Sequence, residues 1–309
     1  MLPLRKIICA TDFSEPAQWA WRRADELAAH FGAEVLLLHV AAPLPPLAGL
    51  SAYPGVAAPD MSGYEEAVSA QAEREMNALL AMKSDGVQAR FEVRWGDAPA
   101  TILATAAHEK ADLIVMSSHG QGGWRRQVFG SVAEKVLRQS ACPVLVVPAG
   151  EKSEDKLLPM TAIVAPTDFS EPSHAVLDVA GEWAAHFDAE LYPLHVVAPL
   201  HQPGVIVSRA RLEESVQADA VQKLYALVAE RLPQVKKTHP IARRGRVAEQ
   251  IADVAVAHKA QLIVISTHGA GGWQILFSGT AIDHALFGSV ASNVLRLAMC
   301  PVLVLREKA

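Results

Sequence analysis

Residues 7–16 read IICATDFSEP and residues 163–172 read IVAPTDFSEP, so the chain carries the same stretch twice. Two more blocks repeat in the same order, FGSVA at 129–133 and 287–291, and CPVLV at 142–146 and 300–304. Three matching blocks in one order indicate a tandem duplication, and each copy has the usual length of one domain. We expect domains over residues 1–149 and 159–309, joined by a linker at about 150–158, where Gly150 precedes a run of charged residues.

Within each copy, short apolar runs alternate with longer amphipathic segments. The runs are nearly continuous in Val, Ile and Leu, which is typical of parallel strands covered on both faces. The order predicts an α/β fold with two doubly wound, five-stranded parallel sheets. The predicted strands are Lys6–Ala10, Glu34–Val40, Gln88–Arg94, Leu113–Ser117 and Val144–Val147, then Thr161–Ala165, Glu190–Val196, Lys237–Ala242, Leu262–Ser266 and Val302–Leu305. The predicted helices of the first copy are Glu15–Phe31, Glu65–Lys83, Ala98–Glu109 and Val132–Gln139.

The composition limits the class of protein. Hydrophobic residues make up 51% of the chain and charged residues 20%, close to the average for folded domains. A net charge of −5 argues against a nucleic-acid or anionic-membrane surface. Three scattered cysteines fit neither a disulfide framework nor a zinc site. The start of the chain lacks a signal-peptide pattern and no apolar run has the length of a membrane span, so we expect a cytoplasmic location.

In each copy, one aspartate follows the first predicted strand. In an open α/β sheet, ligands bind beyond the carboxyl ends of the strands, so Asp12 and Asp168 are candidate ligand contacts. The competing interpretation is a helix cap. Ser14 and Ser170 are better placed for capping, because Glu and Pro follow each serine as suits a first helical turn.

A glycine-rich segment follows the fourth predicted strand. Residues 117–123 read SSHGQGG, and Gly130 and Ser131 open the next helix. Glycine backbone and a helix N-terminus together form a cradle for a phosphate. The alternative is a turn with a capping box made by Ser131 and Glu134. The segment matches neither a Walker A loop nor a dinucleotide fingerprint, and no histidine pair has zinc-like spacing beside a third ligand, so we predict no metal cage.

The ordered set of motifs resembles the universal stress protein family in its tandem form, over essentially the whole chain. The motifs are the Thr-Asp-Phe-Ser opening, Leu-His-Val at the end of the second strand, the Ser/Thr-His-Gly-x-Gly-Gly loop, Gly-Ser-Val-Ala and Cys-Pro-Val-Leu-Val. The resemblance implies a Rossmann-like fold in which the two halves form an intramolecular pseudo-dimer through their last strands. The whole chain is then expected to be a monomer or a homodimer.

The resemblance also implies an ATP site, since some family members bind ATP, with Mg²⁺ as a candidate companion. Those members carry Gly-x-x-Gly, nine residues, then Gly-Ser/Thr. Here Ser117 replaces the first glycine, while Gly120, Gly130 and Ser131 fit. The contacts implied for the first half are Asp12 and the Val40 backbone with adenine, Met116 and Ser117 with ribose, and Gly120, Gly130, Ser131 and Val132 with the phosphates.

The second half departs further from that pattern. Its corresponding residues are Asp168, Val196, Ile265, Ser266, Gly269, Gly288 and Ser289. Ser266 again replaces the first glycine, and the loop is nine residues longer, with Gly279-Thr280 as an alternative pair. The basic pair at 125–126 is replaced by Gln274 and Ile275. We therefore expect nucleotide binding chiefly in the first half.

Three functions remain open from the sequence. The leading one is a stress-response protein that binds an adenine nucleotide and acts as a sensor or a switch for an unknown protein partner, with Ala41–Met61 as a lid. The second is a scaffold for dimerisation that binds no nucleotide, because both first glycines are replaced. The third is a slow ATP hydrolase with Asp12 and Ser131 as metal contacts, although the motifs contain no clear catalytic base.

Overall fold

The computed structural model describes residues 1–43, 63–120, 130–149, 157–198, 206–267 and 289–306, with side chains from 215 onward in the fifth segment. The first half contains, in chain order, β1 (Lys6–Thr11), α1 (Glu15–Phe31), β2 (Glu34–Ala41), α2 (Tyr64–Leu80), β3 (Gln88–Trp95), α3 (Ala98–Glu109), β4 (Leu113–Ser117), α4 (Ser131–Gln139) and β5 (Val144–Val147). The second half contains β6 (Ala162–Pro166), α5 (Glu171–Phe187), β7 (Glu190–Val197), α6 (Ile206–Arg231), β8 (Ile241–Arg244), α7 (Val247–Ala257), β9 (Leu262–Ser266), α9 (Ser289–Leu297) and β10 (Val302–Leu305).

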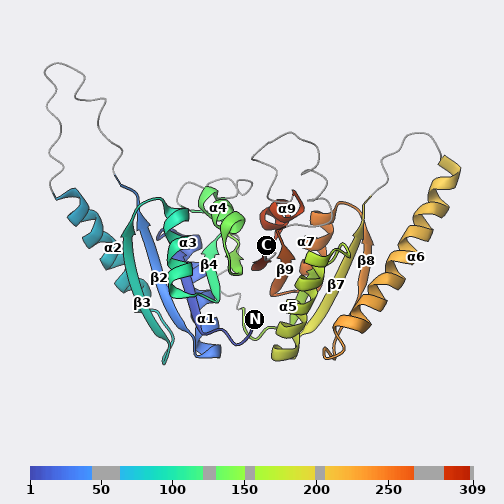
Figure 1. Cartoon of the computed structure of the whole chain (residues 1–309), viewed down its shortest axis with the longest axis horizontal. Coiled ribbons are helices and arrows are strands. Elements are labelled where there is room, and N and C mark those ends of the chain that lie inside the picture. Colours follow the sequence, from blue (N-terminus) through green and yellow to red (C-terminus); the bar gives the residue numbers. More distant parts are fainter. Residues whose placement is uncertain (44–62, 121–129, 150–156, 199–205, 268–288, 307–309) are drawn as a thin grey trace, which may run out of the picture.

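The strands of both halves form one ten-stranded sheet in the order β3-β2-β1-β4-β5-β10-β9-β6-β7-β8. Pairing is parallel within each half, and β5 pairs with β10 antiparallel at the centre, with Leu145 opposite Leu303. The two halves therefore form the intramolecular pseudo-dimer implied by the resemblance, and β3 lies at an edge as its alternating pattern predicts (Figure 1).

Helices cover both faces of the sheet because its inner strands are apolar on both sides. In β1, Ile7 and Cys9 face one buried cluster, and Ile8 and Ala10 face the other. The first cluster includes residues from α1, α2, α5 and α6, and the second includes residues from α3, α4, α7 and α9. Burial of Cys9 raises the pKa of its thiol far above the ordinary value, so this cysteine is a core residue rather than a nucleophile.

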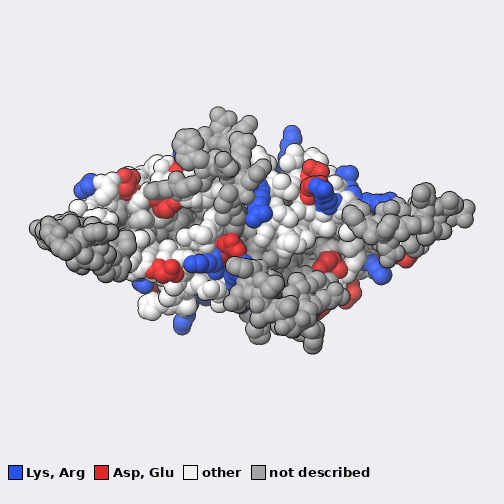
Figure 2. All heavy atoms as spheres, turned by 90° about the horizontal axis from the view of Figure 1, so that it is seen from above, with Lys and Arg blue, Asp and Glu red and all other residues white. Residues whose placement is uncertain are grey.

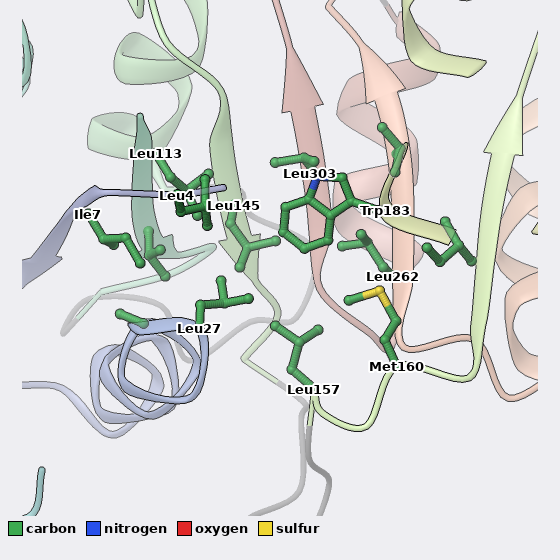
Figure 3. Close-up of a cluster of buried hydrophobic side chains, with 14 of the residues drawn as sticks. Leu4, Ile7, Leu27, Leu113, Leu145, Leu157, Met160, Trp183, Leu262 and Leu303 are labelled. Atoms are coloured by element: carbon green, nitrogen blue, oxygen red, sulfur yellow. The ribbon is translucent and has the colours of Figure 1, made fainter. Parts of the chain in front are cut away.

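The first cluster runs without interruption from one half into the other. Figure 3 shows Leu157 and Met160, on the segment that leads into β6, pointing into it beside Trp183 of α5. Leu157, Met160 and Trp183 are each at most 1% exposed. The backbone N–H of Leu157 donates to Glu26 Oε2 at 2.9 Å, which ties this segment to α1. A shared core therefore holds the halves together.

Element boundaries differ from the predictions at a few ends. The largest difference is β8, predicted at Lys237–Ala242 and observed at Ile241–Arg244. Pro240 lacks an N–H and cannot donate to a ladder, so only an isolated bridge at Thr238 precedes it. The helix predicted at Glu65–Lys83 is α2, which begins one residue earlier and ends at Leu80. None of the helices that the structure describes is long and apolar enough to cross a membrane.

Candidate functional site

The switch in strand order of the first half lies between β1 and β4. From β1 the chain passes outward to β2 and β3, then returns to β4 on the other side of β1. The carboxyl ends of β1, β2 and β4 lie together along the upper side of the sheet in Figure 1. Crevices of this kind are where open α/β sheets bind ligands, and Asp12, Val40, Met116 and Ser117 all lie at this edge or one residue past it.

The turn after β1 holds its backbone in an unusual conformation. Phe13 has a φ of 65°, in the left-handed region that costs a non-glycine residue free energy. Its N–H donates to Thr11 Oγ1 at 3.1 Å, and its ring lies 4.3 Å from that of His39. His39 Nδ1 lies 2.9 Å from the Thr11 carbonyl oxygen; because a carbonyl only accepts, Nδ1 carries the proton. His39 therefore braces this turn, a role that sequence reasoning missed.

Asp12 is set inside this turn. The half-buried carboxylate accepts hydrogen bonds through Oδ1 from the Ser14 N–H at 3.1 Å and from Ser14 Oγ at 2.6 Å. Ser14 Oγ also accepts from the Ala17 N–H at 3.4 Å, so Ser14 caps α1 as predicted. Because Ser14 caps the helix, Asp12 does not. The hydrogen bonds from Ser14 hold the Asp12 carboxylate at the crevice.

Gly120 meets Asp12 across the crevice. A Cβ added to Gly120 would lie 2.4 Å from Asp12 Oδ2, far closer than a carbon and an oxygen can approach. Only glycine fits there without displacing the carboxylate. Two residues predicted independently, one after β1 and one after β4, are thus brought into one site.

Backbone hydrogen bonds fasten Ser118, just past β4, to Gly130 and to β5. The Gly130 N–H donates to the Ser118 carbonyl at 2.9 Å, and the Ser118 N–H donates to the Val147 carbonyl at 2.8 Å. Ser117 Oγ donates to the His119 carbonyl at 2.7 Å, so the residue that replaces the first glycine uses its hydroxyl within the turn. A fixed backbone frame therefore surrounds the Gly120 side of the crevice.

Helix α4 begins at this frame. Gly130 is the N-cap residue and makes no side-chain cap, and Ser131 is the first helical residue, followed by half-buried Val132. The suggested capping box of Ser131 and Glu134 is therefore wrong: Glu134 pairs with Arg138 at 2.8 Å, and the Gly130–Ser118 bond fixes the helix start one residue earlier. The first turn of α4 offers backbone N–H groups and the positive end of a dipole, which suit an anion.

The second half repeats the turn but not every contact. Phe169 also has a φ of 65°, and His195 Nδ1 lies 2.8 Å from the Thr167 carbonyl oxygen. Asp168 accepts from the Ser170 N–H at 3.0 Å and from Ser170 Oγ, and it is exposed. Ser170 makes no cap bond, contrary to expectation, and Ser173 Oγ donates to the Ser170 carbonyl at 2.8 Å.

The remaining residues predicted for the second half are only partly described. Val196 and Ile265 are buried, Ser266 ends β9, and Ser289 is the exposed first residue of α9. Gly269 and Gly288, and the alternative Gly279-Thr280 pair, lie outside the described residues. The longer loop of the second half and all of the Ala41–Met61 segment past residue 43 lie outside them as well.

The rims of the two crevices differ in charge. Strand β3 ends in Arg94 and Trp95, and Asp97 then caps α3 by accepting from the Ala100 N–H at 3.2 Å. The equivalent positions at the end of β8 are Arg243 and Arg244, and Arg246 is the N-cap residue of α7. Aligning the copies through Gly96 and Gly245 reveals this difference in the sequence, yet sequence reasoning passed over it. In the view onto this edge, acidic and basic side chains lie interspersed (Figure 2).

The described ranges contain no group of three or more His, Cys, Asp and Glu residues placed to hold a metal ion. The two metal contacts suggested for a hydrolase, Asp12 and Ser131, lie at the ends of β1 and α4 respectively.

Known proteins match the chain along its whole length. The family model of the universal stress protein family matches twice, at residues 3–148 and 160–306. A universal stress protein of Mycolicibacterium smegmatis is 27% identical over 310 residues, covering 98% of this chain and 97% of its own. Among solved structures, a universal stress protein from Archaeoglobus fulgidus superposes with a TM-score of 0.60 at 21% identity, covering 97% of this chain and 96% of its own. A functionally unknown protein from Pseudomonas aeruginosa superposes with a TM-score of 0.62 at 19% identity, covering 98% of this chain and 92% of its own. With both repeats matched by the family model, the chain belongs to the universal stress protein family.

Proposed function

We propose that this stress protein binds an adenine nucleotide, ATP in particular, in the crevice of its first half. The observation that carries the proposal is the approach of Gly120 to the Asp12 carboxylate. It joins the two motifs that the family resemblance assigns to opposite ends of a nucleotide. Hydrogen bonds to Thr11, His39 and Ser118 hold the backbone on both sides of this contact, which supports a preorganised site.

Each end of the ligand has a matching group. Asp12 presents an acceptor for the adenine amino group, and the Val40 backbone lies at the end of β2 beside it. Met116 and Ser117 border the ribose from β4. The N–H groups of Gly130, Ser131 and Val132 suit phosphate oxygens, with Mg²⁺ neutralising the remaining charge.

The first half is the stronger candidate for three reasons. Its Gly120 to Gly130 spacing fits the ATP pattern, whereas the second half has nine more residues there. Arg125 and Arg126 add positive charge to its glycine-rich loop, where the second half has Gln274 and Ile275. Asp168 is exposed, while Asp12 is half-buried, so an interaction with Asp12 is less screened by water.

Nucleotide binding acts as a switch in the proposed function. The protein works in the cytoplasm, and its two domains are residues 1–149 and 159–309. The Ala41–Met61 segment directly follows β2, beside the proposed adenine contact. A nucleotide in the crevice orders that segment and changes the surface offered to a protein partner. Limited proteolysis with and without ATP tests this step: cleavage within residues 44–62 should slow several-fold, and unchanged cleavage would contradict the switch.

A scaffold that binds no nucleotide is the alternative. Ser117 and Ser266 both stand where the ATP pattern has glycine, and the central β5–β10 pair already gives the chain a dimer-like architecture. The Ser117→Gly variant distinguishes the two functions. Under the nucleotide account the parent chain already binds ATP and the variant binds it at least as tightly, whereas under the scaffold account the parent chain does not bind ATP.

A further inference from the structure

Two equivalent histidines meet at the centre of the molecule. His30 and His186 lie 156 residues apart, the same separation as Asp12 and Asp168, so they occupy the same position in the two copies. In a duplicated chain, equivalent residues meet only where the pseudo-twofold axis passes. His30 ends α1 and His186 ends α5, and these helices lie on either side of the midline in Figure 1. The pair therefore joins the first helix of one half to the first helix of the other.

One hydrogen bond holds the two rings end to end. Their Nε2 atoms are 2.9 Å apart, and the rings are nearly perpendicular, at 84°, with centroids 5.2 Å apart. Such a bond needs one ring that donates its Nε2–H and one that offers an Nε2 lone pair. The bond therefore exists only while at least one of the two rings is neutral.

Two phenylalanine rings flank the pair. Phe187 lies 4.8 Å from His30 and Phe31 lies 5.0 Å from His186, centroid to centroid, in the contacts that cross the axis. The apolar rings cover part of each imidazole, so a charge there is less well solvated than on an open surface. Both histidines are still exposed to solvent, and protons can reach them directly.

The carboxylates one turn earlier on each helix already have partners. Glu26 Oε1 lies 2.5 Å from Arg23 Nη1, and Glu26 Oε2 accepts from the Leu157 N–H at 2.9 Å. Glu182 Oε2 lies 2.8 Å from the N-terminal ammonium group of Met1. Both carboxylates are therefore engaged away from the histidines.

Opposing effects act on a positive charge at this position. Each histidine lies in the last turn of a 17-residue helix, where the negative end of the helix dipole favours a charged ring. Asp188, the C-cap residue of α5, is also acidic, but it pairs with Lys237 Nζ at 2.8 Å. Burial first, and then the charge of His186, lower the pKa of His30. The balance therefore disfavours a proton on His30, most of all when His186 is charged.

We propose that the His30–His186 hydrogen bond is an acid-sensitive latch between the two halves, closed while the pair carries at most one extra proton and opened when both rings are protonated. The first extra proton keeps the bond, because an imidazolium ring donates to a neutral one. The second removes the last Nε2 lone pair and places two like charges at the axis. The halves then keep their shared core and the β5–β10 pair, but α1 and α5 lose this link.

The direction of the pH dependence follows from His30. Its pKa in the folded chain is lowered below the unfolded value of about 6.5, so the folded chain binds this proton less well than the unfolded chain. The stabilisation from the latch is therefore complete above about pH 6.5 and is lost as the pH falls through the folded pKa.

A double-mutant cycle of His30→Asn and His186→Asn in the full chain tests the proposal. Asparagine is polar, but its amide ends where Nδ1 stands and falls short of the partner ring. Urea unfolding of the four proteins, in steps from pH 8 down to pH 4, gives the coupling between the two residues, and the cycle cancels the other titrating groups. At pH 8 either substitution should lower the urea midpoint, and adding the second should lower it little further.

The coupling should stay constant above about pH 6.5 and disappear or change sign at lower pH. His108→Asn is the matched control, because His108 is 79% exposed on α3, away from the pair, and should show no coupling to His186→Asn at any pH. Coupling that is absent at pH 8, equal at all pH values or larger in acid would overturn the proposal.

Proton magnetic resonance of the histidine Cε1–H signals gives a second measurement that does not depend on unfolding. In His186→Asn, the titration midpoint of His30 should rise towards the ordinary value, because one of the two causes that lower its pKa is gone. Far-ultraviolet circular dichroism checks that the variants fold as the parent does. A His30 midpoint that is unchanged in folded His186→Asn would contradict the latch.

Discussion

The contact between Gly120 and Asp12 gives the sharpest test of the site. In Gly120→Ala the new Cβ would lie 2.4 Å from Asp12 Oδ2, about 1 Å inside normal contact, so the carboxylate must turn away. It then gives up its hydrogen bonds from the Ser14 N–H and Oγ. Two such bonds to a half-exposed carboxylate, partly replaced by water, correspond to about 2 kcal/mol of unfolding free energy.

A double-mutant cycle measured by urea unfolding isolates this contact. In the Asp12→Ala background there is no carboxylate to displace, so Gly120→Ala should cost less than about 0.5 kcal/mol. In the Asp12→Asn background the side chain keeps its size, and the cost should return. If the Gly120 and Asp12 substitutions are additive within about 0.5 kcal/mol, the two residues do not meet and the reasoning fails.

Three further predictions concern the scaffold around the site. Leu157→Ala should lower the unfolding free energy by about 2–4 kcal/mol in urea titration, because Leu157 is 1% exposed between the halves; Met82→Ala, at 52% exposed, should change it by less than about 0.5 kcal/mol. Thr11→Val should cost about 1–2 kcal/mol in the same assay by leaving the Phe13 N–H without its acceptor, and a neutral result would remove Thr11 from the account of the turn. Hydrogen bonds from Lys6, then Arg90, lower the pKa of Glu109 to about 2, so its stabilisation is complete above the unfolded pKa of about 4.3 and is lost as the pH falls towards 2. Glu109→Gln should therefore cost about 1 kcal/mol at pH 7 and almost nothing near pH 2 in pH-dependent urea midpoints, and a cost that is independent of pH would contradict this.

Much of the fold was predictable because it depends on local pattern. Continuous Val, Ile and Leu runs predicted the buried parallel strands, and the family resemblance supplied the pairing of the last strands. The start of β8 was misplaced because the strand was placed by repeating the order of the first copy, without allowing for Pro240, which cannot donate to the ladder. The capping box failed for a different reason: the Gly130–Ser118 hydrogen bond, a tertiary contact, decides where α4 begins.

In the candidate site too, local motifs were predictable from the sequence and tertiary contacts were not. Asp12 and Gly120 were found from their motifs, but their direct approach depends on how the turns after β1 and β4 face each other. The bracing role of His39 needed the register that sets β2 beside β1.

The most direct test of the central claim is a calorimetric titration of Mg²⁺-ATP into the full chain, with Gly120→Val alongside. The account predicts one site per chain, abolished in Gly120→Val because the side chain fills the space beside Asp12. Far-ultraviolet circular dichroism on the same samples checks that the variant is folded. Two sites per chain, or binding that survives Gly120→Val in a folded protein, would contradict a nucleotide site in the first half alone, and no binding would favour the scaffold.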